Sequence, residues 1–484
     1  MAYYDTAMLF DGVPFLDLLK RKRTFSDEAL AALTRVVEKK SGGRLLFDAG
    51  QFPLNDPSLA EPELIARALR ERGVLLSCSL SERLPDEPPT KAWRAQCSGE
   101  RRQQVGGASW TSHEDALYAT LAEALERFIW TERTEHFESP VRANVAAMRS
   151  EKRAMLAPER FVSFSSAHRN ADRRKQLRDD ASYQWIRARS LVSGNALFIP
   201  AQVASGVKLD HDEPLIRDRN TNGLATFPTK DGAELAGMLE LIERDAYLIL
   251  WLNRLSAPRI ALEALRAREP KIDAVLRTLA RYRMRLHAVQ MPTDAPTHAI
   301  LAVIEDETGH APRFSVGLKA HRDLSRAVEK AALEALRARS GVRRAPSVAG
   351  AEQRETPVDR IGHRERLYYW ADPAHADELS FLIEGAEVEV NGAVWESDSE
   401  SEHRARILAW CKARSYECVS VSLTHSPWNP TPWHIAMIVM PDLHHLWLTE
   451  PNRQLAGDRW RSVPPLFDLP VRSEPYLDGP HPFS

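Results

Sequence analysis

Glutamates recur in three motifs whose residue types and spacing suit the binding of cations. The carboxylates and the arginines beside them are Glu123, Glu126, Arg127, Glu240, Glu243, Arg244 and, in a partial third copy, Glu334. In each copy an alanine stands seven residues before the first glutamate, almost two helical turns, so both lie on one helix face. Two glutamates three residues apart are one turn apart, so their carboxylates are neighbours.

Carboxylates from several helices that met in one site would need positive charge between them, because desolvating an unpaired carboxylate is costly. Mg²⁺ is the natural candidate, since it takes oxygen ligands and is usually held by carboxylates together with substrate phosphates. Arg127 and Arg244 can pair with carboxylate or phosphate groups. A single motif of this kind is more often a solvated helix face with an ion pair. The repetition is what favours a shared site.

A polar loop at 220–226 precedes the second motif. Thr221 and Asn222 supply a hydroxyl and a side-chain amide, and Gly223 allows backbone freedom. A plain turn would use the same residue types, so both a binding loop and a simple turn remain open.

The elements that must position these groups are long helices alternating with short strands. Helical spacing predicts helices over 114–132, 232–255 and 324–340, and apolar runs predict strands at 196–199, 299–304, 417–423 and 434–440. Ser112 and Asp231 have the spacing of N-terminal caps, and Gly341 is in position to cap the third helix. The pattern predicts an α/β or α+β fold with several antiparallel strands.

Composition describes an ordinary globular chain. Its 484 residues include 43% hydrophobic and 27% charged residues, and the formal net charge of -2 argues against nucleic acid or an anionic membrane as a partner. No stretch approaches eighteen apolar residues and no signal-like segment opens the chain, so we expect a cytoplasmic protein. Its four cysteines are expected to be buried thiols.

Proline-rich residues 84–89 predict a boundary between two parts of the chain. Residues 1–90 would form a small N-terminal α/β segment of unknown role. Residues 95–484 would form the main domain with a proline-rich C-terminal tail.

These motifs together resemble those of the YcaO family. The run 221–225, followed by Glu240-Leu-Ile-Glu243-Arg244-Asp245, is similar to the central motif of that family. The helices that carry Glu123 and Glu334 are similar to its earlier and later helices. The resemblance covers about residues 95–484.

Membership of this family would imply a fold of mixed sheets and long glutamate-bearing helices around a central nucleotide site, with ATP and Mg²⁺ as cofactors. The metal ligands implied are Glu123, Glu126, Glu240 and Glu243. The nucleotide-binding residues implied are Asn222, Thr221, Arg127, Arg244, Lys330, Glu334 and Ser109.

The last third of the chain resembles the azoline-forming D-protein branch, including its proline-rich ending at 480–484. This implies a tail that reaches the active site, with the terminal carboxylate of Ser484 and the imidazole of His481 as catalytic candidates. A frayed terminus is the alternative. The chain departs from the pattern of many relatives at three points: Ser109 lies in a loop without the usual lysine, Lys330 replaces an arginine, and Ser484 replaces a final proline.

The activity implied is an ATP-dependent cyclodehydratase of ribosomally made peptides. A Cys, Ser or Thr side chain of a precursor peptide attacks the preceding amide, whose oxygen is phosphorylated and lost, leaving a thiazoline or oxazoline. The partners implied are the precursor peptide, a ThiF-like leader-binding protein and a flavin-dependent dehydrogenase, in an oligomer or complex. Thioamide or amidine formation, a docking scaffold with weak turnover, and metal-dependent hydrolysis without nucleotide remain alternatives.

Overall fold

A computed structural model describes residues 57–81, 83–98, 103–132, 140–206, 209–344, 357–363, 365–390, 392–426 and 429–483. The chain packs as two compact units. The first consists of Met1–Pro85, Pro89–Glu132 and Ser426–Pro432, and the second of Asp86–Pro88, Arg133–His425 and Trp433–Ser484. Most of the predicted N-terminal segment, residues 1–56, lies outside the described residues.

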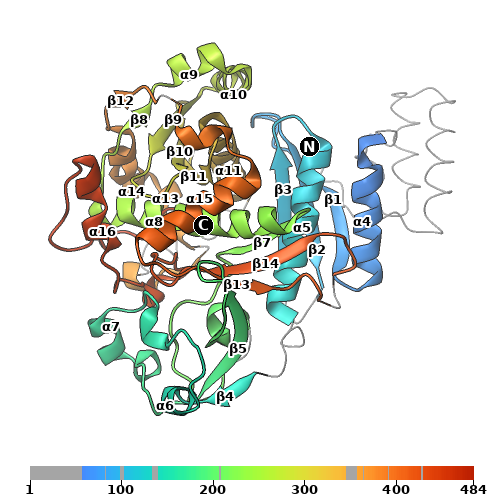
Figure 1. Cartoon of the computed structure of the whole chain (residues 1–484). Coiled ribbons are helices and arrows are strands. Elements are labelled where there is room, and N and C mark those ends of the chain that lie inside the picture. The colour runs from blue at the N-terminus through green and yellow to red at the C-terminus, as the bar shows by residue number, and fades with distance from the viewer. Residues whose placement is uncertain are drawn as a thin grey trace. The chain divides into compact units, whose positions relative to one another are not determined.

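The first unit is built on a three-stranded antiparallel sheet in the order β1-β2-β3. The strands are β1 (Leu75–Leu80), β2 (Lys91–Cys97) and β3 (Gln103–Ser109). Helix α5 (His113–Glu132) lies along the sheet and α4 (Ala60–Glu71) packs beside it (Figure 1). Leu117, Leu121 and Leu125 are fully buried, so the apolar stripe of α5 faces the sheet while its glutamates border the core.

The described residues of the second unit form two sheets. The first has the order β11-β10-β9-β8-β12 and is antiparallel except where β12 pairs with β8. Its strands are β8 (Arg259–Ile260), β9 (Met284–Gln290), β10 (His298–Asp306), β11 (Phe314–His321) and β12 (Glu387–Val388). Helix α11 (Leu324–Arg344) packs on β10 and β11, and α10 (Pro270–Arg281) packs on β9.

The second sheet has the order β4-β5-β13-β14-β7, and β6 pairs with β5. Its strands are β4 (Val141–Ala143), β5 (Tyr183–Ser190), β6 (Ala196–Pro200), β7 (Leu224–Phe227), β13 (Val419–Ser422) and β14 (His434–Val439). The other α-helices that the structure describes in this unit are α6 (Val145–Ser150), α7 (Ser166–Ala171), α9 (Leu262–Arg268), α13 (Glu365–Ala371), α14 (Pro373–Ala376), α15 (Glu400–Ala413) and α16 (Arg459–Ser462).

Helix α8 (Lys230–Asn253) contacts both sheets of the second unit, packing on β7 and β14 and also on β10 and β11 (Figure 1). Residues 245–253 are buried without interruption, as expected for a helix that is surrounded by protein. Its first half packs against α15 and β14, and its second half enters a core that includes aromatic residues of the last third of the chain.

The mixed α+β architecture predicted from the sequence is confirmed, as are the four buried, free cysteines. The backbone N–H of Asp115 donates to Ser112 Oγ at 3.0 Å, so this predicted cap is also confirmed. The predicted cap at Asp231 is wrong: Thr229 is extended and accepts from the N–H of Gly232 at 3.1 Å. Gly341 does not end the third helix, which continues to Arg344.

The middle of the proline-rich stretch at 84–89 packs into the second unit. Glu87 is buried and accepts from Arg339 Nε at 3.1 Å and from Arg343 Nη1 at 2.5 Å. This packing places Asp86–Pro88 in the second unit although residues on both sides belong to the first. The predicted division of the chain into domains near residue 90 stays a prediction. Among the described residues, the structure contains no helix long and apolar enough to cross a membrane.

Gly317 brings β11 very close to α11. A Cβ atom at this glycine would lie 2.3 Å from both Ala331 O and Ala335 N, whereas a Cβ at Gly341 would meet nothing within 4 Å. We therefore expect Gly317→Ala to lower the free energy of unfolding by about 1–3 kcal/mol through overpacking. Gly341→Ala should raise it by about 0.5–1 kcal/mol because Gly341 lies inside a helix.

Chemical denaturation of the two variants beside the wild type measures both effects. An unchanged stability of Gly317→Ala would contradict the close strand–helix contact.

Candidate functional site

The first glutamate of each motif binds the backbone of the segment that precedes its helix. Glu123 accepts from the N–H of Gly106 at 3.2 Å, and Glu240 from that of Gly223 at 3.0 Å. Glu334 accepts from the N–H of Leu318 at 2.6 Å. The upstream alanines of the three motifs are fully buried on the same helices. The repeat seen in the sequence is therefore a repeated structural contact, made once in the first unit and twice in the second.

Two glutamates, one from α11 and one from α8, accept from the free edge of β11 in the second unit. Glu334 takes the N–H of Leu318, and Glu243 takes the N–H of Ala320 at 2.7 Å. These donors are alternate residues of a strand that pairs with β10 on its other side, so both N–H groups point away from the sheet. The open edge is covered by acidic side chains of α8 and α11, which thereby come close together.

Arg244 lies among the three carboxylates of the second unit. Its guanidinium contacts Glu243 at 2.6 Å and Glu240 at 3.3 Å. Burial, opposed by Arg244 and reinforced by the Glu243 carboxylate, raises the pKa of Glu334 to about 7. The pKa is raised chiefly because this carboxyl group is removed from water, and the Glu243 charge adds a smaller contribution.

This donor set fits a divalent cation that is completed by phosphate. Among the described residues no three acidic, histidine or cysteine side chains are arranged to hold a metal ion by themselves. Mg²⁺ usually takes only one or two carboxylates and fills its other positions with water and phosphate oxygens. Glu240 and Glu243 supply such a pair, with Arg244 beside them as a partner for phosphate.

The first unit carries the other part of the predicted site. Glu123 is half-buried and lies 3.7 Å from Arg127, one turn further along α5, and Glu126 is also partly exposed. Ser109 is buried at the end of β3, where its Oγ accepts from the N–H of Ser112 at 3.2 Å. The predicted residues therefore fall in two compact units, and their meeting around one nucleotide stays a prediction.

The loop before α8 is held in place by the last third of the chain. Asn220 and Asn222 are buried, and their side-chain amides donate to Leu446 O at 2.7 and 3.2 Å. Thr221 O accepts from the N–H of Leu224 at 2.9 Å, so the segment does form a turn. The same turn directs the N–H of Gly223 at Glu240, so it helps to fix the position of this carboxylate in the acidic cluster. Lys330 lies one helical turn before Glu334 on α11.

The C-terminal tail packs into the second unit, so a frayed terminus is the wrong alternative for residues 480–483. His481 is fully buried and Phe483 nearly so, while Ser484 lies outside the described residues. The guanidinium of Arg244 stands 4.3 Å from the centroid of the Phe483 ring. Tyr247, one turn after Glu243, packs against both tail rings at 5.9 Å. The tail therefore touches the arginine that holds the acidic cluster.

Arg366 of α13 anchors this tail. Its fully buried guanidinium donates to the imidazole of His481 and to Phe483 O at 3.1 Å, and forms an ion pair with Glu450 at 3.4 Å. His481 Nε2 donates to Trp447 O at 2.9 Å, which leaves Nδ1 to accept from Arg366 at 2.9 Å. Burial and the adjacent Arg366 charge hold the pKa of His481 well below its usual range. The imidazole is therefore neutral and acts as a structural link in this arrangement.

Sequence reasoning missed two parts of the site. A glycine stands seventeen residues before the first glutamate in all three motifs, at Gly106, Gly223 and Gly317, and this spacing marks the backbone that each carboxylate contacts or adjoins. Arg366 gave no local signal, because its partners are 81 to 117 residues away along the chain.

Replacing Arg366 should release the tail. Arg366→Met leaves the carbonyl groups of Trp447, Leu448 and Phe483 without their buried donor, so we expect the free energy of unfolding to fall by about 3 kcal/mol or more. Carboxypeptidase should then remove residues from the C-terminus faster than from the wild type. Arg360→Met, at an exposed site, is the control and should change stability by less than about 0.5 kcal/mol. Equal digestion of both variants would refute the anchoring role.

Stability should fall on mild acidification. His481 is neutral in the folded chain but titrates near its usual value of 6.5 when unfolded, so its contribution is complete above about pH 6.5 and declines as the pH falls further. His444, whose pKa burial lowers to about 4, acts in the same direction. We expect the melting temperature of His481→Asn to change less between about pH 7.5 and about pH 5.5 than that of the wild type. Parallel curves would contradict this assignment.

Comparison with solved structures identifies the same fold in several enzymes. A heterocyclase in complex with substrate and cofactor aligns with 87% of this chain and 57% of its own, at 19% identity and a TM-score of 0.68. YcaO from Methanopyrus kandleri bound with AMPPCP and Mg²⁺ aligns over 83% and 94%, at 18% identity and a TM-score of 0.59. The E. coli microcin synthetase McbBCD complex with pro-MccB17 bound contains a chain that aligns over 83% and 96%, at 15% identity and a TM-score of 0.54.

The chain spans only 29% and 41% of the lengths of two curated relatives that it matches. A family model described as a YcaO cyclodehydratase that binds ATP and Mg²⁺ matches residues 109–444, which include all three glutamate motifs. This match covers more than half of the 484-residue chain, and the chain therefore belongs to the YcaO family.

Proposed function

We propose that this chain is an ATP- and Mg²⁺-dependent cyclodehydratase that activates the backbone amide of a peptide. The observation that carries the proposal is the cluster of Glu240, Glu243 and Glu334 around Arg244, in a member of a family described as binding ATP and Mg²⁺. A heterocyclase with substrate and cofactor bound shares the fold, which supports the same class of reaction.

The reaction removes one water from the peptide at the expense of ATP. The side-chain S–H or O–H of a Cys, Ser or Thr residue loses its proton, and the sulfur or oxygen bonds to the preceding amide carbon. The amide oxygen then takes the γ-phosphoryl group of ATP, and ADP leaves. Loss of phosphate from that carbon and of a proton from the amide nitrogen then leaves the azoline ring. Phosphorylation is needed because an unmodified amide oxygen is a poor leaving group.

The chain's own residues have distinct tasks in this scheme. Glu240 and Glu243, with Glu123 and Glu126 of the first unit, would hold Mg²⁺, which neutralises charge on the phosphates when bound. Arg244 is fixed by two carboxylates and by the Phe483 ring, so it can face developing phosphate charge without reorganising. The tail would bring Ser484 toward the site, where its carboxylate is the candidate base.

We infer that the enzyme acts in the cytoplasm on a ribosomally made precursor peptide, with partner proteins. Support comes from the microcin synthetase complex with pro-MccB17 bound, which shares the fold. A ThiF-like leader-binding protein and a flavin-dependent dehydrogenase are the partners that the sequence resemblance implies. The azoline-forming D-protein branch is favoured over thioamide and amidine formation because the tail docks against Arg244.

Removing one carboxylate of the cluster should abolish most ATP turnover. Glu243→Gln keeps the shape of the side chain but loses its charge, so we expect at least about a tenfold fall in the Mg²⁺-dependent turnover of ATP. Glu263→Gln makes the same change at an exposed glutamate of α9 and should leave turnover unaltered.

Phosphate release and peptide mass, measured with and without candidate peptides and partners, report the two activities separately. Loss of one water per ring indicates azoline formation, whereas replacement of oxygen by sulfur indicates a thioamide. Wild-type turnover by Glu243→Gln at all Mg²⁺ concentrations would overturn the proposal.

A further inference from the structure

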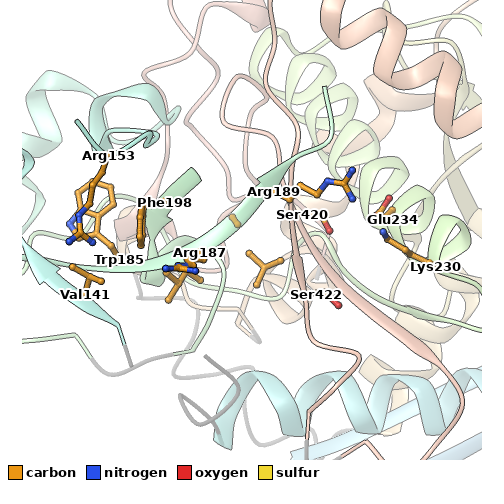
Figure 2. Close-up of a pocket in the computed structure, with 13 residues that line it drawn as sticks. Val141, Arg153, Trp185, Arg187, Arg189, Phe198, Lys230, Glu234, Ser420 and Ser422 are labelled. Atoms are coloured by element: carbon orange, nitrogen blue, oxygen red, sulfur yellow. The ribbon is translucent and has the colours of Figure 1, made fainter. Parts of the chain in front are cut away.

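A groove of about 390 Å³ lies in the second unit and is lined by residues other than those of the glutamate cluster, although one of its ends is formed by the start of the same helix, α8. Strand β5 forms its floor, with β6 and β13 on either side and the first turn of α8 at one end (Figure 2). All of its lining residues belong to the same compact unit.

Positive charge dominates this groove. Arg153, Arg187, Arg189 and Lys230 line it, and Glu234 contributes the single carboxylate of the lining. Glu234 is buried and accepts from Arg404 Nε at 2.7 Å, so its charge is already offset. In Figure 2 the cations are spread along the groove, from Arg153 at one end through Arg187 to Arg189 and Lys230 at the other.

Two of these cations are available to a ligand. Arg189 is exposed on β5, and Lys230 is exposed at the start of α8. Within the part of the chain that the structure describes, no carboxylate lies within ion-pair distance of either side chain. Lys230 also adds its charge to the positive end of a 24-residue helix. Carboxylates in the groove would therefore meet unneutralised charge at this end.

The shape of the groove suits an extended peptide. Its floor runs from Trp185 to Arg189, about 13 Å at the usual rise of a strand, which matches about four residues of an extended chain. Arg187 and Arg189 are two residues apart on one strand, so they project to the same side with the spacing of alternate residues in such a peptide. Ser422 of β13 is exposed along the groove and offers a hydroxyl for hydrogen bonding.

The aromatic residues of the lining argue against a nucleic acid. Single-stranded nucleic acids combine backbone contacts to cations with stacking of bases on open aromatic rings. Trp185 is fully buried, and Arg153 lies over the Phe198 ring at 5.4 Å. Trp185 offers no exposed face for a base and the Phe198 ring already has a guanidinium over it, so abundant positive charge with little open aromatic surface favours a peptide rich in carboxylates.

We propose that this groove binds an acidic stretch of about four residues in the substrate peptide, outside the residues that react. The inference rests on the proposed function in one respect, that the substrate is a peptide. It adds a second point of attachment, which would hold the substrate by its charge and leave the modified residues free to enter the nucleotide site.

The test measures binding without ATP, so that it does not depend on turnover. The probe is a fluorescein-labelled peptide with four successive glutamates, a glycine–serine spacer and one cysteine, and the matched probe carries glutamines in place of the glutamates. We expect the full-length protein to bind the acidic probe in a salt-sensitive manner and the glutamine probe much more weakly. Fluorescence anisotropy reports both affinities.

The groove variant is Arg189→Glu with Lys230→Glu. Both changes are at exposed positions, and a glutamate at the start of α8 suits the helix dipole, so the fold should be retained. We expect the affinity for the acidic probe to fall by at least about tenfold. The control, Lys271→Glu with Arg281→Glu on α10, makes the same charge change at exposed positions outside the groove and should bind as the wild type does.

Equal binding by the groove variant and the control, or no preference for the acidic probe, would overturn the proposal. Tighter binding of single-stranded RNA, lost in the groove variant, would overturn it in favour of a nucleic acid. Glu243→Gln should still bind the acidic probe. If that variant and the wild type bind the probe but the wild type with ATP, Mg²⁺ and partners releases no water from any candidate peptide, the groove stands and the proposed chemistry fails.

Discussion

Carboxylates that accept backbone N–H groups are the interaction on which the rest of this structure depends. An edge strand normally exposes a row of unsatisfied donors, which must be covered or paired. Here Glu243 and Glu334 satisfy alternate donors of β11, and Glu240 does the same for the turn at Gly223. This arrangement fixes the two helices to the sheet, and it also brings acidic groups together in a partly buried place where a cation is favoured.

Arg244 connects this cluster to the end of the chain. It neutralises part of the acidic charge, and its other surface stacks on the Phe483 ring. Arg366 holds the tail from the far side through His481 and the carbonyl of Phe483. Two guanidinium groups from different helices, one fully and one largely buried, therefore hold the last residues in place. A change in the charge of the acidic cluster would therefore alter the position of Arg244 and, with it, the packing of the tail.

The second unit combines an acidic cluster on one part of α8 with a basic groove at the start of the same helix. Glu240 and Glu243 lie in the middle of α8, whereas Lys230 stands at its first position. A peptide whose acidic residues are bound along β5 would not bring those residues to the glutamate cluster of α8. Like charges in that partly buried site would repel each other. Along one helix, the basic groove would attract the acidic part of a substrate and the glutamate cluster would repel it. Together the two charges would orient the substrate.

The sequence by itself determined the long helices, the antiparallel strands and the repeated glutamates, because helical and strand periodicity are local properties. It also located the turn at Thr221–Gly223 and the cap at Ser112, which depend on neighbouring residues. Only the tertiary structure decided that the motif glutamates at positions 123, 240, 243 and 334 accept hydrogen bonds from the backbone of a strand or turn. The anchoring of the tail by Arg366 and the positive groove along β5 were likewise decided there, because both arise from residues far apart in the chain whose contact no local pattern records.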